Sequence, residues 1–257
     1  MLDCIILAGG VNADLEKLEG TPNKALIKID NKEMVRYVLE TYRQVKDIER
    51  IVLVGPAEDF AFVEKEFSVE LVPETGSILE NLTAASRFLN TQKPVLISTA
   101  DIPLISPLAV RDFLEKCLPF DYDFYYPIVR REKCEESFPG VKRTYVNLKE
   151  GVFTGGNIFA VKPEKIEPTV PRLKLFIENR KNPVKMASLL GTGFLIRLMA
   201  KKLNISQLET RFSSLLDLNS KAIISDYPEI GFDLDKPSDL ELIREVMGQK
   251  SSTERQD

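Results

Sequence analysis

The sequence of 257 residues contains no histidine. This absence excludes imidazole general bases, imidazole metal ligands and Ser-His-Asp triads together. Any chemistry must therefore use carboxylates, lysines, hydroxyls, backbone dipoles or a hard metal ion. Reactions at phosphorus suit that limit, because enzymes of this kind work mainly by positioning and by neutralising charge.

Cysteine is also scarce, since the chain has three, Cys4, Cys117 and Cys134, far apart in sequence. No CxxC spacing occurs that would indicate zinc binding or a redox pair, so we expect reduced thiols in a cytoplasmic protein. Long apolar runs are lacking too, because the run after the first residues is too short for a signal or membrane helix. The sequence therefore predicts no membrane partner.

Neither sign of charge dominates the chain, which has 35 Lys and Arg against 39 Asp and Glu and a net charge of −4. This balance gives no basic field for binding nucleic acid through its phosphates, so we expect a small-molecule partner. The length suffices for one large α/β domain with an ample core. We expect that domain to span residues 1–247 and a disordered polar tail to follow over 248–257.

Strands and helices alternate in the first half of the chain. Strands are predicted at 4–7, 51–54, 69–72 and 94–99, a short extended piece at 26–29, and helices at 33–45, 60–67, 79–89 and 107–117. Apolar strands that alternate with helices of this length indicate right-handed crossovers. The sequence therefore predicts an α/β fold with a doubly wound, mostly parallel Rossmann-like sheet.

From Asp121 the pattern loosens. Strands are predicted at 125–129, 143–148, 155–161, 222–224 and 230–234, with a charged loop between the first two, and a last helix from Pro237 to about Met247. Between them, residues 163–215 form a predicted helical insertion. This insertion is compatible with core packing, a lid over a substrate, an interfacial helix or the surface of a homodimer.

The apolar run from Cys4 to Leu7 ends at Gly9 and Gly10, which places bare backbone N–H groups at the carboxyl end of a strand. Open α/β sheets bind ligands at this edge, and such N–H groups bind phosphate. Lys24 would supply a cation to the same place. An ordinary strand-to-helix turn with a surface lysine is the alternative.

Three carboxylates are candidates for a metal site. Asp101 follows a buried strand and precedes a turn with Pro103, which is where ligand chemistry occurs in such sheets. Asp233 and Asp235, spaced i, i+2, would point to one face of the predicted strand and complete a Mg²⁺ site with Asp101. Alternatively, Asp101 forms a turn and one of the other two caps the last helix.

Five short motifs occur in a characteristic order: Leu7-Ala8-Gly9-Gly10, Asn23-Lys24-Ala25-Leu26, Ala100-Asp101-Ile102-Pro103, Gly155-Gly156-Asn157 and Gly231-Phe232-Asp233-Leu234-Asp235-Lys236-Pro237. With these motifs the sequence resembles the MobA-like NTP transferases. That group includes the molybdenum cofactor guanylyltransferases and is similar to the sugar-phosphate nucleotidyltransferases. The resemblance covers nearly the whole chain except 163–215, and it implies a nucleotide-diphospho-sugar transferase-like fold.

The resemblance also implies roles for individual residues. Lys24 and Asp101 would be catalytic, and Asp101, Asp233 and Asp235 would hold Mg²⁺. Nucleotide contacts would come from Leu7, Ala8, Gly9, Gly10, Lys24, Gly76, Asn81 and Asn157. By this resemblance, Gly76 and Asn81 would lie in the segment that reads the base, with a plain loop and helix start as the alternative, and Asn157 would lie where the acceptor pocket forms.

The acceptor phosphate has a candidate binding cluster in Arg130, Arg131, Lys133, Lys142 and Arg143, although such clusters are usually solvated faces. One position departs from the family, since Asp14 stands where an arginine is usual and lies near Glu16 and Glu19.

Two hypotheses follow. The first is a Mg²⁺-dependent nucleotidyltransferase that moves NMP from an NTP to a phosphorylated acceptor and releases pyrophosphate. The second, suggested by Asp14, is a nucleotide-binding or regulatory protein that kept the fold and lost catalysis. An NAD-dependent oxidoreductase is disfavoured, because Gly9 and Gly10 lack the further spaced glycine of a dinucleotide fingerprint.

Overall fold

A computed structural model describes residues 1–179 and 183–253 of the chain. Its centre is a mixed sheet with the strand order β5-β4-β1-β6-β10-β7-β9-β8, and β11 pairs with β7. The strands of this sheet are β1 (Leu2–Leu7), β4 (Ile48–Gly55), β5 (Glu70–Pro73), β6 (Val95–Thr99), β7 (Phe124–Arg130), β8 (Val146–Leu148), β9 (Gly151–Gly155), β10 (Ile158–Val161) and β11 (Ser220–Ser225). The predicted α/β class and doubly wound sheet are confirmed.

The first half of the sheet is parallel, because β1 pairs with β4 and β6 and β4 pairs with β5 in that sense. The helices of this half are α1 (Ala13–Glu19), α2 (Met34–Arg43), α3 (Ala57–Phe67), α4 (Ile78–Leu89) and α5 (Pro107–Cys117). The short turn η1 (Lys24–Leu26) and the small hairpin β2 (Lys28–Ile29) and β3 (Lys32–Glu33) lie between α1 and α2.

Alternation of side chains along β1 explains why helices cover both faces. Cys4 and Ile6 belong to a core formed with α2, α3 and α5, whereas Ile5 belongs to a second core formed with α4 and with Ile166 of α7 (Ile166–Asn179). Successive residues of a strand point to opposite faces, so a strand that is apolar throughout is buried on both. The apolar strands of this half thus build the layered fold.

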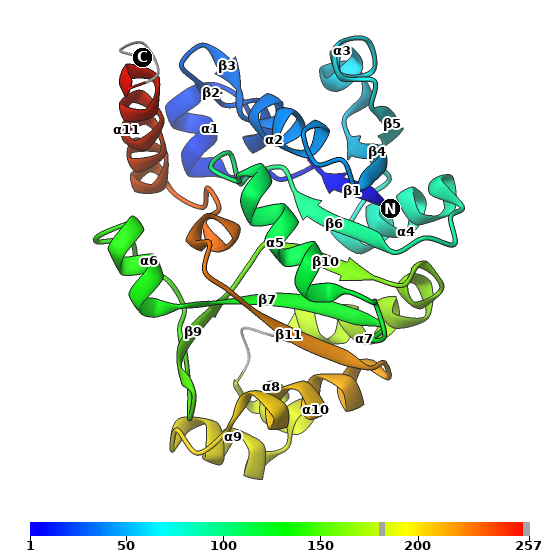
Figure 1. Cartoon of the computed structure of the whole chain (residues 1–257), viewed down its shortest axis with the longest axis vertical. Helices are drawn as coiled ribbons and strands as arrows, with labels where there is room; N and C mark the ends of the chain where they lie inside the picture. The colour runs from blue at the N-terminus through cyan, green and yellow to red at the C-terminus, as the bar shows by residue number, and fades with distance from the viewer. Residues whose placement is uncertain (180–182, 254–257) are drawn as a thin grey trace.

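The second half of the sheet is largely antiparallel. The strand β10 runs antiparallel to β6 and β7, and the hairpin β8–β9 continues the sheet from β7, while β11 lies parallel to β7. The segment predicted to be a helical insertion is mainly helical over its described residues, with the turn η2 (Pro163–Lys165), α7, α8 (Pro183–Leu190), α9 (Thr192–Met199) and α10 (Ile205–Leu216). Figure 1 shows α8, α9 and α10 gathered at the end of the molecule opposite α11 (Pro237–Thr253).

The structure corrects several predicted elements. The acidic segment after Gly10, for which no element was predicted, is the helix α1, capped by the Asn12 side chain, and the charged loop after β7 contains the helix α6 (Arg131–Ser137). The predicted strand at 155–161 is two elements, the end of β9 and all of β10, and the predicted strand at 143–148 begins only at Val146.

Residues 230–234 are not a strand either, because they begin in the turn η3 (Pro228–Gly231) and pair with no strand. The helix α11 extends to Thr253 rather than ending near Met247, and residues 254–257 of the predicted tail lie outside the described residues. Within 1–179 and 183–253, no helix combines the length and the apolar content that crossing a membrane requires.

Candidate active site

The loop after β1 forms one wall of a cavity at the carboxyl end of the parallel strands. Ala8 donates its backbone N–H to the carbonyl of Val54 at 2.7 Å, which anchors the start of the loop. The N–H groups of Gly9 and Gly10 donate to no acceptor in the described part of the chain. A side chain at Gly10 would meet the Cε of Lys24 at 3.2 Å, so glycine here lets the lysine lie against the loop.

Asn23 fixes the position of Lys24. Its side-chain amide donates to the carbonyl of Ala8 at 2.7 Å, and its oxygen accepts the N–H of Ala25 at 2.9 Å. The backbone N–H of Lys24 donates to the carbonyl of Gly10 at 2.9 Å. Asn23 therefore joins the β1 loop to η1 and holds the lysine at the cavity wall.

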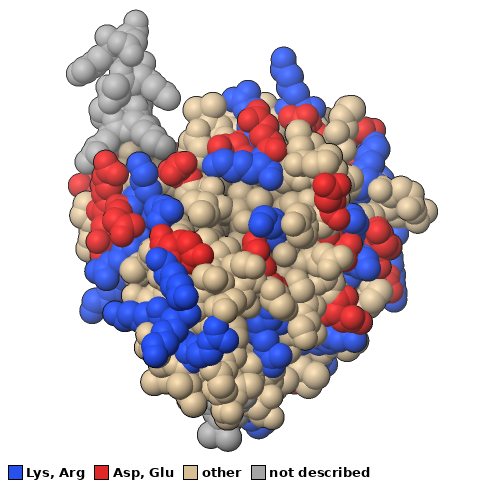
Figure 2. Space-filling view, turned by 60° about the horizontal axis from the view of Figure 1, so that its bottom comes forward, with Lys and Arg blue, Asp and Glu red and all other residues tan. Residues whose placement is uncertain are grey.

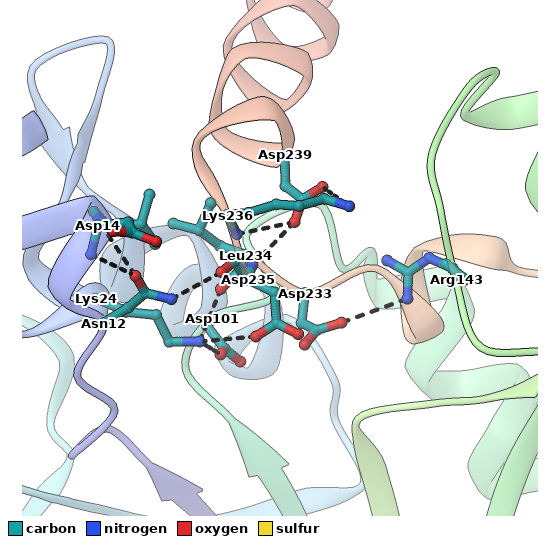
Figure 3. A network of polar contacts seen from close by, with 11 residues as sticks. Asn12, Asp14, Lys24, Asp101, Arg143, Asp233, Leu234, Asp235, Lys236 and Asp239 are labelled. Atoms are coloured by element: carbon teal, nitrogen blue, oxygen red, sulfur yellow. Dashed lines mark hydrogen bonds and ion pairs between the residues drawn. The ribbon is translucent and has the colours of Figure 1, made fainter.

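The amino group of Lys24 is the centre of a polar network in which it donates to Asp101 and, at 2.8 Å, to the carbonyl of Leu234 (Figure 3). It also lies 3.6 Å from Asp235. Lys24 is only 8% exposed. Burial by itself lowers the pKa of Lys24, but the carboxylates of Asp101, Asp235 and Asp233 raise it above its ordinary value, so the lysine is a firmly held cation.

Asp101 follows β6 and Asp233 follows η3, and both carboxylates lie near this lysine. The backbone N–H of Leu234 donates to the carbonyl of Asp101 at 2.9 Å, which ties residues 233–235 to the end of β6. Burial, followed by the nearby carboxylates of Asp101 and Asp235, raises the pKa of Asp233. Arg143 opposes this rise from 3.4 Å away.

Asp235 and Asp239 differ in their exposure and in their contacts. The Asp235 side chain is 73% exposed at the mouth of the cavity. Asp239 instead accepts the N–H groups of Asp235 and Lys236, both at 3.1 Å, and so fixes the segment that precedes α11. Asn12 adds a bond from its side-chain amide to the carbonyl of Asp235 at 2.8 Å.

These groups surround a cavity of about 450 Å³. It is lined by Leu7, Ala8, Gly9, Gly10, Val11, Lys24, Ala25, Gly76, Ile78, Asn81, Thr99, Ala100, Asp101, Asp233 and Asp235. The structure thus brings together the predicted catalytic residues, the predicted metal ligands and every predicted nucleotide contact except Asn157. Its size is that of a small-molecule site.

A second cavity of about 330 Å³ adjoins the first. Asp233 and Asp235 line both cavities, and Thr154, Asn157 and Arg143 face the second. Lys142 lines it too, whereas Arg130, Arg131 and Lys133 of the predicted basic cluster contact Glu150, Glu135 and Glu136 instead. The predicted cluster is therefore split, and two of its five members face a cavity.

Asn157 is held at the wall of the second cavity. Its backbone N–H donates to the carbonyl of Ile230 at 2.9 Å, and its side-chain amide lies 3.4 Å from the same oxygen. This close approach requires glycine at position 156, because a Cβ there would lie 2.6 Å from the Ile230 side chain. The glycine and asparagine of this motif thus position the junction between β9, β10 and η3.

Asn81 serves the first cavity by shaping a loop. Its side-chain oxygen accepts the N–H of Thr75 at 2.7 Å and the N–H of Gly76 at 3.3 Å. The loop before α4 is thereby held beside the β1 loop.

Several residues that line the first cavity had no signal of their own in the sequence. Thr99 ends β6 two residues before Asp101, and Ile78 begins α4 after the motif at Gly76. Their proximity in sequence to the recognised motifs could have identified these residues. Asp14, the position that departs from the family, is exposed in the first turn of α1 and does not line the cavity.

The donor set of the first cavity fits a hard divalent cation such as Mg²⁺. The Oδ1 atom of Asp101 is buried and has no hydrogen-bond partner in the described part of the chain. Oxygen ligands and excess negative charge, here three carboxylates against Lys24, are what Mg²⁺ prefers. Within the described ranges, no group of three or more His, Cys, Asp or Glu side chains is already close enough to enclose a metal ion.

Charges of both signs are spread over the face drawn in Figure 2, so this face has no uniform basic field.

The fold and the site together are those of a nucleotidyltransferase. The chain belongs to the MobA-like NTP transferase domain family, which it matches over residues 4–183, and the resemblance seen in the sequence is thus confirmed. No curated protein matches the sequence.

Solved structures support the fold. A transferase from Thermus thermophilus described as hypothetical is 34% identical with a TM-score of 0.81, and the match covers 93% of this chain and 99% of that chain. The 4-diphosphocytidyl-2C-methyl-D-erythritol synthase of Anaerococcus prevotii is 14% identical with a TM-score of 0.61 and 96% of both chains covered. A CMP:2-keto-3-deoxy-manno-octonic acid synthetase complexed with CTP is 14% identical with a TM-score of 0.62, covering 97% of this chain and all of the other.

Proposed function

We propose that the protein transfers NMP from an NTP to a phosphorylated small molecule, with Mg²⁺, and releases pyrophosphate. The observation that carries this proposal is that two adjoining cavities share Asp233 and Asp235. One cavity offers Lys24 and backbone donors, and the other offers Arg143. Two phosphate-bearing substrates can therefore meet at one set of carboxylates.

The first cavity would hold the NTP. The N–H groups of Gly9 and Gly10 and the amino group of Lys24 would donate to phosphate oxygens, which stabilises the charge that develops on the leaving pyrophosphate. The loop held by Asn81 would lie against the base. The solved synthetase with CTP bound in the same fold supports a triphosphate as the ligand.

Asp101, with Asp233 and Asp235, would hold Mg²⁺, which when bound neutralises phosphate charge and polarises the phosphorus centre. The buried, unpartnered oxygen of Asp101 supports this assignment. Lys24 donates to the other oxygen of Asp101 and so balances part of its charge.

The second cavity would hold the acceptor phosphate beside Arg143. An oxygen of that phosphate attacks the α-phosphorus of the NTP in line, and the bond from the α-phosphorus to the bridging oxygen breaks. A phosphate monoester is already an anion at neutral pH, because its second pKa is about 6. The chain therefore needs no general base, which agrees with its lack of histidine.

The proposal is tested by a panel of the four NTPs crossed with phosphorylated acceptors, with and without Mg²⁺, scored by pyrophosphate release. We expect one combination to turn over, and Asp101→Asn to remove that turnover while the far-ultraviolet circular dichroism spectrum stays unchanged. Asp226→Asn, at an exposed aspartate after β11, is the control and should retain turnover. Full turnover of Asp101→Asn would refute the role of this carboxylate.

A regulatory protein that binds nucleotide without catalysis is the second candidate. It is favoured by one observation, that Lys24 is the only cationic side chain among the described residues that line the first cavity. Calorimetry separates the two candidates. Nucleotide binding followed by acceptor-dependent pyrophosphate release requires the enzyme, whereas binding without release under any combination favours the regulator.

A further inference from the structure

A third cavity, of about 390 Å³, lies between the sheet and the helices α4, α7 and α10. Its walls are almost entirely hydrocarbon. It is lined by Leu7, Ile78, Leu79, Leu82, Ile97, Phe124, Tyr126, Phe159, Val161, Lys165, Ile166, Thr169, Leu173, Phe176, Ile177, Phe212, Leu216 and Leu218. These residues come from β1, β6, β7 and β10 on the sheet side and mainly from the three helices on the other.

This cavity has the size of a ligand pocket. Protein interiors are close-packed, and voids larger than a water molecule are few, whereas about 300 Å³ and more is the size of ligand pockets. Among the described residues, Lys165 is the single charged side chain in the lining, and its amino group lies 3.5 Å from Asp123. An uncharged, hydrocarbon ligand therefore fits the walls.

One polar group in the lining also lacks a partner. The hydroxyl of Tyr126 is buried and makes no hydrogen bond within the described part of the chain. A buried hydroxyl without a partner is costly, and a ligand oxygen would satisfy it. Tyr126 is thus a polar group of the lining that a bound molecule or an ordered water would satisfy.

The third cavity adjoins the candidate active site. Leu7 at the end of β1 and Ile78 at the start of α4 line both this cavity and the first one. Along β10, Asn157 precedes the strand and lines the second cavity, and Phe159 two residues later lines the third. A molecule bound at the shared carboxylates can therefore extend past these residues into the apolar space.

We propose that the acceptor is amphipathic: a phosphate monoester of a hydrocarbon chain, with the phosphate at the second cavity beside Arg143 and the chain in the third cavity. This assignment rests on the proposed function and names its substrate class. The apolar walls would hold the hydrocarbon chain of the ligand, because its burial is favourable. Arg143 would then fix the position of the phosphate. The product would be a diphosphate diester that joins the NMP to the hydrocarbon alcohol, with pyrophosphate as the second product.

The first arm of the test needs no variant. Butyl, octyl and dodecyl phosphate, each below its aggregation concentration, are titrated into the full chain by calorimetry with Mg²⁺ and without NTP. Each buried methylene contributes up to about fourfold in affinity. We expect octyl phosphate to bind at least about tenfold more tightly than butyl phosphate. Equal affinities along the series would overturn the proposal.

The second arm uses a matched pair of variants on α7. Leu173→Trp fills the cavity, whereas Leu175→Trp adds the same side chain at a residue of the same helix that is 52% exposed and outside the lining. We expect Leu173→Trp to remove the dependence on chain length and Leu175→Trp to retain it. If Leu173→Trp weakens NTP binding instead and leaves chain-length dependence intact, the cavity belongs to the nucleotide and the proposal is wrong.

The third arm separates this proposal from the proposed function. Pyrophosphate release is measured with the same alkyl phosphates and each NTP. If binding depends on chain length but no combination releases pyrophosphate, the cavity assignment stands and the transfer reaction is overturned. Release with short polar phosphates and no preference for longer chains would support the transfer reaction and overturn the amphipathic acceptor.

Discussion

Replacing Lys24 by methionine should destabilise the protein markedly, because the lysine is the cation that balances the carboxylates of the site. Lys24 donates to Asp101 and to the carbonyl of Leu234, and it lies 3.6 Å from Asp235. Methionine keeps most of the apolar stem and removes the charge and the donors. The change therefore isolates the electrostatic contribution.

The expected loss is about 3 kcal/mol in the free energy of unfolding. Removing one partner of a buried ion pair costs roughly 3–5 kcal/mol, because the remaining charge is uncompensated. We take the lower end because the Asp101 side chain is 17% exposed at an open cavity and can regain water. For a protein of this size the loss corresponds to a fall of about 6–12 °C in Tm.

Urea unfolding measures this loss, with and without Mg²⁺. We expect Mg²⁺ to stabilise Lys24→Met more than the parent, since the cation can bind where the lysine no longer competes. The double variant with Asp101→Asn should lose clearly less than the sum of the two single variants. Lys28→Met, at a lysine whose side chain is 62% exposed, is the control and should lose less than about 1 kcal/mol. A loss below about 1 kcal/mol for Lys24→Met, or additivity in the double variant, would refute the ion-pair reasoning.

Three further outcomes are expected. Burial raises the pKa of Asp123. The backbone N–H of Asn219, which donates to Asp123 at 3.0 Å, and the nearby Lys162 and Lys165 outweigh burial and lower the pKa below the ordinary 3.8. Its stabilising effect is therefore present above the ordinary value and lost as pH falls through the lowered one, so Asp123→Asn should cost about 1–2 kcal/mol in urea unfolding at pH 7 and little near pH 2. A cost that is equal at both pH values would contradict this. Gly156→Ala should lose about 1–3 kcal/mol in thermal unfolding, because the new Cβ would lie 2.6 Å from Ile230, whereas Gly155→Ala has open space and should lose less. Similar losses for the two glycines would count against the steric argument. Arg143→Gln should raise the KM of the acceptor about tenfold and leave the KM of the NTP unchanged in steady-state pyrophosphate release, and the opposite split would place the arginine at the NTP.

The parallel half of the fold was predictable because its strands are apolar throughout and its helices have a single apolar face. The segment after Gly231 was not. Phe232 and Leu234 alternate with polar residues as in a strand, yet both are fully buried in a core with α1 and α11, and the N–H of Leu234 pairs with a loop carbonyl. Periodicity shows which side chains are buried, but it does not show whether another strand is available to pair.

The helix α6 was missed for a related reason. Six of its seven residues are charged or polar, apart from the buried Cys134, so it has no apolar stripe. Its position is fixed by the next residue along the chain, since Phe138 packs against Phe232 with ring centroids 4.5 Å apart. Tertiary contacts after the helix, rather than a pattern within it, determine this element.

The site could be predicted motif by motif but not as two adjoining cavities. Lys24, Asp101 and Asp233 meet as expected, because each follows or precedes an element whose end lies at the same edge of the sheet. The sequence could not show that Arg143 lies at the site and Arg130 does not, since both are arginines in one charged stretch. Only the path of the chain sends Arg130 to the carbonyl of Glu150 and Arg143 to Asp233.

The pairing of these charges also bears on Asp14, which does not line the cavity. Lys24 pairs with Asp101, and Arg143 pairs with Asp233. Under the proposed function, phosphates that draw the two cations away would leave the carboxylates uncompensated, and this would strengthen their affinity for a divalent cation. By linkage, the cation would strengthen phosphate binding by the same factor. The carboxylates and the cation together would then contribute much of the affinity for a triphosphate, so the proposal does not depend on an arginine at position 14.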